Sequence, residues 1–335
     1  MNWETVMAEL EALQKGECVY AELSPLTQDA LHGTMWGLNH RYKSVQECIE
    51  IDKHSMIESS ITKIRPLLAL PDIKTRRRQM PRCGVGFGTY GWKYDHKLIH
   101  EAVKDGVALI DTAEGYGYGR TEEALGKALH GLSDLPGIAT KVRRDHMSSA
   151  ALVSAAERSN KKLGVVPHYQ LHFPHCGYSD QELGSVLVQL RRSGKIKSIG
   201  LGNCSVAMIE SMQRFLSDYS GDVVHSVQVR YNLIDRRIES TLLPYCQQNG
   251  ILVLAYSPLG QSFKELHKPV LDKLAKQFNS TPSQVALAWI LRQPGVLPIP
   301  RTNSILHLRE NIEAGYLYLS AEAIAELEEH YTRKE

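Results

Sequence analysis

The sequence lacks the signals that mark a disulfide-stabilised secreted protein or a membrane protein. Its six cysteines, at positions 18, 48, 83, 176, 204 and 246, are scattered, and no two of them form a CxxC pair. No secretory signal opens the sequence, and no apolar run approaches the roughly 20 residues that a membrane-spanning helix needs. We therefore expect a cytoplasmic protein with reduced thiols and no membrane partner.

A strong charge of one sign is also lacking. The 335 residues carry a formal net charge of +2, and their 43% hydrophobic and 23% charged content is ordinary for a soluble globular enzyme. The basic run at residues 74–78 has no aromatic residues among its cations. We interpret it as a solvated linker and expect no nucleic-acid partner.

Two cofactor or metal motifs are missing as well. No GxGxxG joins a strand to a helix, which argues against a Rossmann domain. The glycines at 115, 117 and 119 superficially resemble a phosphate loop, but they more simply allow the chain to turn after Asp111. His172, His175 and Cys176 suggest zinc, but nothing nearby in the sequence completes a set of four ligands, so we expect no metal.

What the sequence does contain is a regular spacing of polar residues, each at the carboxyl end of an apolar strand pattern. Asp111, Lys141 and His172 are separated by 30 and 31 residues. That interval is the length of one strand plus one helix in a (β/α)8 barrel. Because the carboxyl ends of the strands meet at one rim, we expect these side chains to converge with Tyr116, which follows Asp111 in a turn bounded by glycines.

Apolar patterns support this interpretation over most of the chain. They predict eight strands, near 84–88, 107–111, 137–141, 168–172, 197–201, 224–229, 251–256 and 296–300. Helical patterns fill the intervals, for example at 122–132, 149–163, 206–216 and 321–330. We therefore predict an α/β fold, a (β/α)8 TIM barrel over residues 83–335 with an N-terminal α-helical extension.

The leading segment differs in pattern from the barrel region. Residues 1–72 predict short amphipathic helices, one of which opens with a capping box at residues 44–47, and residues 73–82 predict a linker. Three short helices make a thin core on their own. We expect their apolar faces to pack on the barrel, on a second subunit or on another protein, so a homodimer and a protein partner both stay open.

Asp111, Tyr116, Lys141 and His172, in this order and setting, resemble the catalytic tetrad of the aldo-keto reductase family. Other motifs of the chain are similar to that family too: Met80-Pro81 leading to Gly84-Val-Gly-Phe-Gly88-Thr89, Gly200-Leu-Gly-Asn203, Gln228-Val-Arg-Tyr-Asn232, Tyr256-Ser-Pro-Leu-Gly260 and Ile299-Pro-Arg301-Thr302. The resemblance covers residues from about 80 to the end and leaves the helical extension outside it.

The resemblance implies an NAD(P)H-dependent oxidoreductase that reduces an aldehyde or ketone to an alcohol, or catalyses the reverse reaction. Tyr116 would be the general acid and base, and His172 would donate a hydrogen bond to the carbonyl oxygen of a small-molecule substrate. An ammonium group within about 4 Å lowers the pKa of a tyrosine by up to roughly 3 units. We therefore expect Lys141, kept charged and oriented by Asp111, to lower the pKa of Tyr116.

For the cofactor, the resemblance implies NADPH, with NADH as the alternative. Tyr256 would stack on the nicotinamide, and Arg301 offers a guanidinium suited to a 2′-phosphate. His307, however, stands where NADPH-preferring members commonly carry an arginine, which weakens that preference. The full predicted cofactor set is Gly88, Thr89, Asn203, Gln228, Tyr256, Ser257, Leu259, Arg301, Thr302, Asn303, His307, Glu310 and Asn311.

Tyr90, Trp92 and Phe173 are predicted to line the substrate mouth, although ordinary loop packing would also explain these aromatic residues. A second function stays in view, because a fold does not by itself define an activity. The chain could be a redox-sensing regulatory or binding subunit that retains the aldo-keto reductase fold.

Overall fold

The computed structural model describes residues 84–174 and 177–331. The predicted helical extension (1–72) and linker (73–82) lie outside the described residues, as do His175 and Cys176. Those predictions therefore stay predictions, and the fold below is that of the barrel region.

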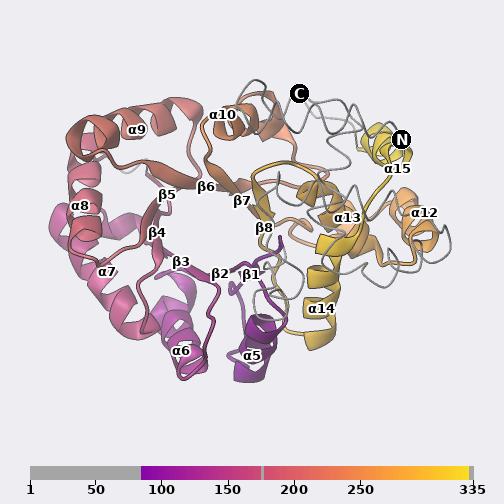
Figure 1. Ribbon diagram of the computed structural model, residues 1–335, viewed down its shortest axis with the longest axis horizontal. Coiled ribbons are helices and arrows are strands. Elements are labelled where there is room, and N and C mark those ends of the chain that lie inside the picture. The colour runs from indigo at the N-terminus through magenta and orange to yellow at the C-terminus, as the bar shows by residue number, and fades with distance from the viewer. Residues whose placement is uncertain (1–83, 175–176, 332–335) are drawn as a thin grey trace, which may run out of the picture. The chain divides into compact units, whose positions relative to one another are not determined.

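Eight parallel strands follow one another in chain order around a ring (Figure 1). They are β1 (Phe87–Gly88), β2 (Leu109–Asp111), β3 (Gly137–Val142), β4 (His168–Leu171), β5 (Ser198–Gly202), β6 (Val224–Arg230), β7 (Leu252–Tyr256) and β8 (Val296–Pro298). The backbone amides of Gly86 and Gly88 donate to the carbonyl oxygens of Pro298 and Pro300, at 2.8 and 2.9 Å. These bonds join β1 to the end of β8. The predicted (β/α)8 barrel is confirmed, and all eight strands overlap the predicted ranges.

Helices surround the strands on the outside of the ring (Figure 1). They are α5 (His96–Lys104), α6 (Arg120–Leu129), α7 (Ser149–Leu163), α8 (Asp180–Arg192), α9 (Val206–Ser220), α10 (Leu242–Gln248), α11 (Phe263–Leu266), α12 (Pro269–Gln277), α13 (Pro282–Leu291), α14 (Ile305–Glu313) and α15 (Ala321–His330). The predicted bounds of α7 and α15 agree with the structure. The prediction placed α6 too late and ended α9 too early.

Local sequence explains where these helices begin and end. Ser179 and Glu182 form a capping box that opens α8, and their side chains and backbone amides bond each other reciprocally. α9 runs four residues beyond its predicted end, to Ser220, and the left-handed conformation of Gly221 (φ 72°) terminates it. α13 is buried along its length, and its Trp289 packs against the Tyr231 ring at 5.5 Å between centroids.

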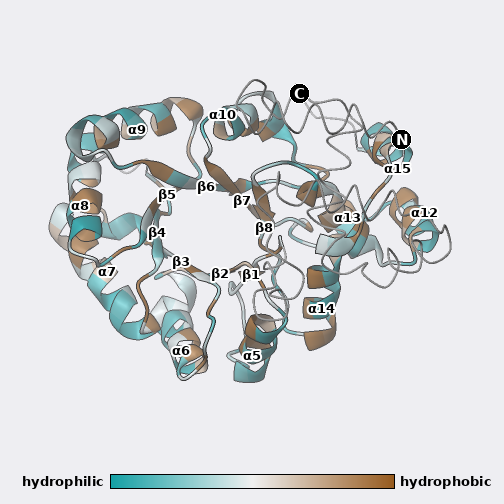
Figure 2. Ribbon diagram, in the orientation of Figure 1, coloured by the Kyte–Doolittle hydropathy of each residue, from teal (hydrophilic) through white to brown (hydrophobic). Residues whose placement is uncertain are grey.

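Apolar residues fill the space between strands and helices. In Figure 2 the ribbon of β7 is coloured mainly as hydrophobic, while the outer helices carry both hydrophobic and hydrophilic segments. Amphipathic helices of this kind bury one face against the sheet and leave the other to solvent. Among the described residues, no helix is long and apolar enough to cross a membrane.

The interior of the barrel also holds a polar group, His168 on β4. Its two ring nitrogens lie 2.6 Å from the hydroxyl oxygens of Ser198 and Ser226. Gly200 on β5 leaves room for this arrangement, because a Cβ there would lie 2.6 Å from His168 Nε2. Burial, aided by the nearby His225 and Lys141, lowers the pKa of His168 to about 4. The ring is therefore neutral in the folded protein.

A first prediction concerns pH. Because the folded pKa of His168 lies below its ordinary value of 6.5, the unfolded chain takes up this proton first, and stability falls as the pH drops from about 6.5 toward 4. At pH 5 the neutral His168 should lower the free energy of unfolding by about 2 kcal/mol. Urea unfolding at pH 7.5 and at pH 5 measures how much stability each protein loses on acidification. His168→Gln, whose side chain can still bond the serines, should lose about 2 kcal/mol less than the unmodified protein. An equal loss in both proteins would contradict the prediction.

A second prediction concerns the crossing of α6 and α7. A Cβ on Gly126 would lie 1.9 Å from the backbone carbonyl oxygen of Lys162, whereas a Cβ on Gly184 in α8 would meet the side chain of Phe215, at 2.4 Å. Backbone cannot move aside as a side chain can. Gly126→Ala should therefore lower the unfolding free energy by about 3 kcal/mol. Gly184→Ala, the matched control, should lower the unfolding free energy clearly less. Equal decreases for the two variants in urea unfolding would show that the backbone contact at Gly126 is not the cause.

Candidate active site

Asp111 and Lys141 form a buried ion pair at the carboxyl ends of β2 and β3. The Nζ atom of Lys141 lies 2.7 Å from both carboxylate oxygens of Asp111 and 2.7 Å from the carbonyl oxygen of Thr112. These bonds use all three N–H donors of the ammonium group. Lys141 is completely buried and Asp111 is 3% exposed, so water and salt screen this pair little.

Two further residues hold Asp111 in place, and both were predicted to contact the cofactor. Thr89 is completely buried, and its backbone amide and its hydroxyl each donate to the carbonyl oxygen of Asp111 at 2.9 Å. Gln228 Nε2 donates to Asp111 Oδ1 at 2.8 Å. The Thr89 hydroxyl is thus engaged within the protein, and the side-chain oxygen of Gln228 is the part of that amide left for a ligand.

Tyr116 lies beside this ion pair. Its ring centroid is 5.1 Å from Lys141 Nζ and 6.4 Å from the centroid of His172, whose ring meets it edge-on at 78°. Tyr116 starts a 3₁₀ turn that contains Gly117 (φ 56°), where a Cβ would lie 2.6 Å from the Tyr94 hydroxyl. The structure therefore brings all four predicted tetrad residues together at one rim.

The pKa of Tyr116 departs from the expectation. Burial, and then the Asp111 carboxylate, raises the pKa of Tyr116 well above its ordinary value of 10, where the sequence led us to expect a decrease caused by Lys141. The main reason is burial, which disfavours the charged phenolate, and the Asp111 carboxylate, which lies 2.7 Å from Lys141 Nζ, adds a negative charge that opposes it. In the protein alone, Tyr116 keeps its proton at neutral pH.

His172 directly follows β4 and is neutral as well. Burial, followed by the positive charge of Lys141, lowers the pKa of His172 to about 4. Its ring stacks on Phe173, with centroids 4.6 Å apart and planes 17° from parallel. Its carbonyl oxygen accepts a hydrogen bond from Asn203 Nδ2 at 3.1 Å. The imidazole is therefore held at the rim as a neutral hydrogen-bonding group.

Asn203, Gln228 and Tyr256 were predicted to hold the nicotinamide, and we refer to them as the nicotinamide seat. Asn203 follows β5 in a left-handed conformation (φ 53°). The hydroxyl of Tyr256 donates to Asn203 Oδ1 at 3.0 Å. Because Asn203 also donates to His172, both halves of its amide are already bonded within the protein. The seat is thus linked directly to the tetrad.

The predicted phosphate and adenine residues gather around the start of α14. Arg301 is exposed and forms no ion pair within the described part of the chain. The side chain of Ser304 caps α14, and the first turn of that helix contains no acidic residue. Thr302 Oγ1 accepts from the Ser304 amide at 3.0 Å. His307 is exposed, Glu310 is half-buried, and Asn311 is only 5% exposed.

Other predicted cofactor residues are engaged in the fold itself. The side chain of Asn303 accepts from the Lys93 amide at 2.9 Å and donates to the Gly91 carbonyl at 3.1 Å, so it ties the segment after β8 to the loop after β1. The carbonyl oxygen of Ser257 accepts from Asn232 Nδ2 at 3.0 Å. Two more residues complete the predicted set: Leu259, which packs against the core, and Gly88, where a Cβ would lie 3.0 Å from the Ile299 carbonyl.

The three predicted substrate residues separate into two kinds. Tyr90 is 64% exposed and Phe173 is 41% exposed, and their rings lie 5.2 Å from Tyr116 and 4.6 Å from His172 between centroids, so their role at a substrate mouth stays a prediction. Trp92 is 4% exposed and belongs to the apolar core around β1. The prediction that Trp92 lines an open mouth is therefore corrected. The loop after β1 is tied down by Asn303, which holds Trp92 against the barrel.

The sequence analysis overlooked a charged group next to Tyr256, consisting of Arg230, Asp235 and Arg237. All three act on the Tyr256 phenol: burial raises the pKa of Tyr256, the two arginines lower it and Asp235 raises it. Side chains alternate between the two faces of a strand. Arg230 follows Gln228 by two residues on β6, and that spacing is the signal that could have identified it.

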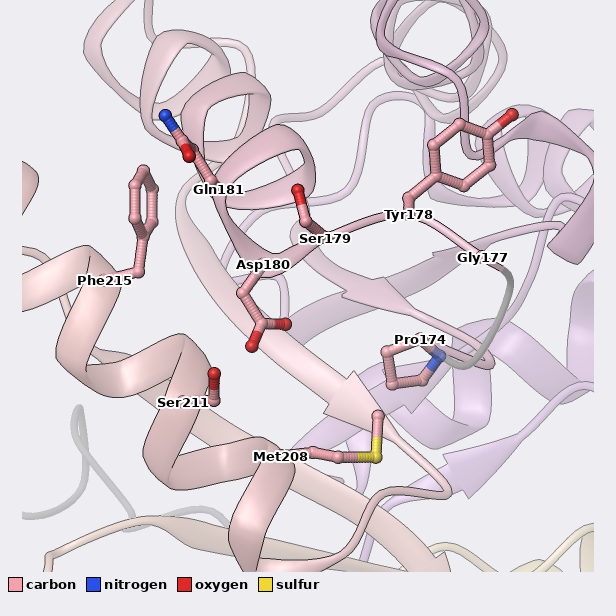
Figure 3. A pocket seen from close by; sticks show the side chains of 9 residues that line it. All are labelled: Pro174, Gly177, Tyr178, Ser179, Asp180, Gln181, Met208, Ser211 and Phe215. Atoms are coloured by element: carbon pink, nitrogen blue, oxygen red, sulfur yellow. The ribbon is translucent and has the colours of Figure 1, made fainter.

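A pocket of about 570 Å³ lies between the start of α8 and α9, away from these residues (Figure 3). Its lining is Pro174, Gly177, Tyr178, Ser179, Asp180, Gln181, Met208, Ser211 and Phe215. The predicted tetrad and the nicotinamide seat do not contribute to it. Within residues 84–174 and 177–331, no group of three His, Cys, Asp or Glu side chains could hold a metal ion.

Comparisons with known proteins agree with this geometry. The chain is 32% identical over 245 residues to methylglyoxal reductase YeaE of Escherichia coli, which covers 71% of this chain and 85% of the relative. It is also 32% identical over 267 residues to pyridoxine 4-dehydrogenase of Escherichia coli, which covers 73% of this chain and 90% of that protein.

Among solved structures, an aldo-keto reductase from Klebsiella pneumoniae in complex with NADPH superposes with a TM-score of 0.70 at 32% identity, covering 75% of this chain and 92% of that one. The sequence model of the aldo/keto reductase family matches residues 84–332. That match includes every strand of the barrel and all four residues of the predicted tetrad. The chain belongs to the aldo/keto reductase family.

Proposed function

We propose that the protein is an NAD(P)H-dependent oxidoreductase that reduces an aldehyde or ketone to an alcohol, or oxidises the alcohol in the reverse direction. The observation that carries this proposal is the buried Asp111–Lys141 ion pair beside the Tyr116 ring. A neutral His172 lies at the same rim. Proton transfer to a carbonyl oxygen needs a proton donor, a nearby positive charge and a group that orients the oxygen.

In the reduction direction Tyr116 donates its proton to the carbonyl oxygen. Its raised pKa means that the proton is present before the reaction starts. The phenolate that remains lies near the Lys141 cation, whose position Asp111 holds through two hydrogen bonds. The neutral ring of His172 donates an N–H to the same carbonyl oxygen and directs it toward Tyr116.

A nicotinamide cofactor, when bound, supplies the hydride that no amino-acid side chain can provide. The residues present fit this group. The half-buried Tyr256 ring and the amides of Asn203 and Gln228 adjoin the tetrad, and the exposed Arg301 stands at the head of α14. A guanidinium and a helix N-terminus both favour a phosphate, which supports NADPH as the preferred cofactor and NADH as the weaker one.

The relatives support the same reaction class. Solved structures of related aldo-keto reductases contain NADPH in one case and NADP with acetate in another. One relative is named as a reductase of methylglyoxal and another as a dehydrogenase of pyridoxine. These names cover both directions of hydride transfer between a carbonyl and an alcohol.

The first test replaces Tyr116 with phenylalanine. Tyr116→Phe should lower kcat for reduction by at least about 100-fold, because the proton donor is lost. The NADPH dissociation constant should change by less than about twofold, because the hydroxyl serves only the reacting oxygen. NADPH oxidation with a panel of aldehydes and ketones measures the first quantity, and NADPH fluorescence titration measures the second.

Tyr118→Phe is the matched control, since Tyr118 is 84% exposed and lies only two residues away; it should leave both quantities unchanged. Turnover that survives Tyr116→Phe would refute the proton-donor role. Binding of NADPH by the unmodified protein without turnover of any carbonyl or alcohol would favour the regulatory or binding subunit.

The second test concerns Arg301. Arg301→Gln should raise the KM for NADPH by about 10- to 100-fold and change that for NADH by less than about twofold, because only NADPH carries the 2′-phosphate. Arg309→Gln, on α14, is the control, since that arginine already pairs with Glu101 and Asp105. An equal rise for both cofactors in Arg301→Gln would contradict a 2′-phosphate contact.

A further inference from the structure

A pocket of about 640 Å³ opens at the rim where β5, β6 and β7 end. We refer to it as the rim pocket. Its polar lining comes from Arg230, Asp235 and Arg237 on one side and Ser205 at the start of α9 on the other, and it shares Asn203 and Tyr256 with the nicotinamide seat.

The charges in the rim pocket do not balance. Arg237 donates to both carboxylate oxygens of Asp235, at 2.9 and 2.8 Å. Arg230 Nε lies 3.7 Å from the same carboxylate, beyond hydrogen-bonding distance. This buried Nε has no hydrogen-bond partner among the described residues, although the side chain as a whole is 32% exposed. Two guanidinium groups therefore share one carboxylate, which leaves one positive charge in excess.

A helix terminus adds to this positive field. α9, which is 15 residues long, begins at Val206 with no acidic residue in its first turn. Ser205, Val206 and Ala207 all line the rim pocket. The free N–H groups at a helix N-terminus carry a partial positive charge. Arg230 and the start of α9 thus both present positive charge to the rim pocket.

The rim pocket is also connected to the candidate active site. The Tyr256 hydroxyl donates to Asn203 Oδ1 at 3.0 Å, and Asn203 Nδ2 donates to the carbonyl oxygen of His172 at 3.1 Å. Asn203 and Tyr256, which line the rim pocket beside Arg230, are therefore joined to His172 by hydrogen bonds. A substrate that reaches His172 with one end can extend toward Arg230 with the other.

We propose that the rim pocket binds an oxyanion, a carboxylate or a phosphate, and that this group is a substituent of the carbonyl substrate. The inference rests on the proposed function, because it names the class of carbonyl compound that the enzyme takes. Arg230 is the specificity-determining residue: its guanidinium completes its hydrogen bonds on the anion. A free anion that binds in the same place is the other source of this chemistry, and the experiment separates the two.

The test compares carbonyl substrates of matched length that differ in charge, using the full chain with NADPH. The pairs are 4-oxobutanoate with butanal and 4-carboxybenzaldehyde with its neutral methyl ester. The unmodified enzyme should prefer the charged member by about 10- to 100-fold in kcat/KM, which is the effect expected of a charged hydrogen bond. Arg230→Gln should abolish this preference by lowering kcat/KM for the charged member about 10- to 100-fold more than for the neutral member.

Two further variants guard against a merely structural effect. Arg230→Lys should restore part of the preference, because the positive charge returns without the planar fork. Arg214→Gln, an exposed position on α9 outside the rim pocket, should leave the preference intact. A preference that is absent in the unmodified enzyme, or that persists in Arg230→Gln, overturns the proposal. A fall in NADPH affinity in Arg230→Gln overturns it as well, because Arg230 would then serve the cofactor.

Calorimetric titration of the NADP-loaded protein with inorganic phosphate and with succinate provides the second readout. If the unmodified protein binds phosphate or succinate and Arg230→Gln does not, the oxyanion site is supported. If no carbonyl is turned over either, only the proposed function fails. Phosphate could instead bind in a way that needs Arg230 while the enzyme shows no preference for charged carbonyls. That result would show that the oxyanion is a free anion and not part of the substrate. No binding of either anion, together with no charge preference, overturns the site.

Discussion

The ion pair between Lys141 and Asp111 is the interaction on which the candidate active site depends. Two opposite charges in a barrel interior are stable only when their remaining hydrogen-bonding groups are also satisfied. Here three N–H donors of Lys141 meet three oxygens, and Asp111 receives a further bond from Gln228. The Thr89 hydroxyl holds the backbone of Asp111 from the neighbouring strand. The pair therefore joins the ends of several strands into one rigid rim.

The same ion pair determines the protonation states around it. Burial dominates the pKa of the Tyr116 phenol and the Asp111 carboxylate raises it further, so Lys141 does not make Tyr116 acidic in the protein alone. His172, which carries no compensating acid, is affected by burial and by the nearby ammonium, and its pKa falls to about 4. The protein alone thus holds a protonated tyrosine and a neutral histidine, which are the states that the proposed carbonyl reduction would use.

The rim pocket has a positive electrostatic field that is separate from that of the tetrad. Arg230 lies two residues beyond Gln228 on β6, so both side chains are on the same face of the strand. Gln228 orients Asp111, and Arg230 presents a cation. The electrostatic environment therefore changes from a neutral pair at the tetrad to an excess positive charge across Tyr256. The two regions are linked by hydrogen bonds through Asn203.

Much of the fold and of the site follows from local signals. The intervals between Asp111, Lys141 and His172 predicted the barrel and the meeting of these residues, because each strand and helix unit has a nearly constant length. The bounds of α7 were predictable because Ser148 precedes it and Gly164, in a left-handed conformation, ends it. For cofactor residues such as Thr89 and Asn303 the structure shows bonds within the fold, and their contact with a cofactor stays a prediction, since a polar side chain beside a site can serve the ligand, the fold or both.

The sequence by itself determined the kind of fold, the order of its strands and the four side chains that converge, because these depend on periodicity and spacing along one chain. Only the tertiary structure decided that burial and Asp111 raise the pKa of Tyr116, that Trp92 is buried, and that Arg230 faces a pocket with too few acids. These properties depend on burial and on distances between segments far apart in sequence. Electrostatic energies change steeply with both, and no local pattern records them.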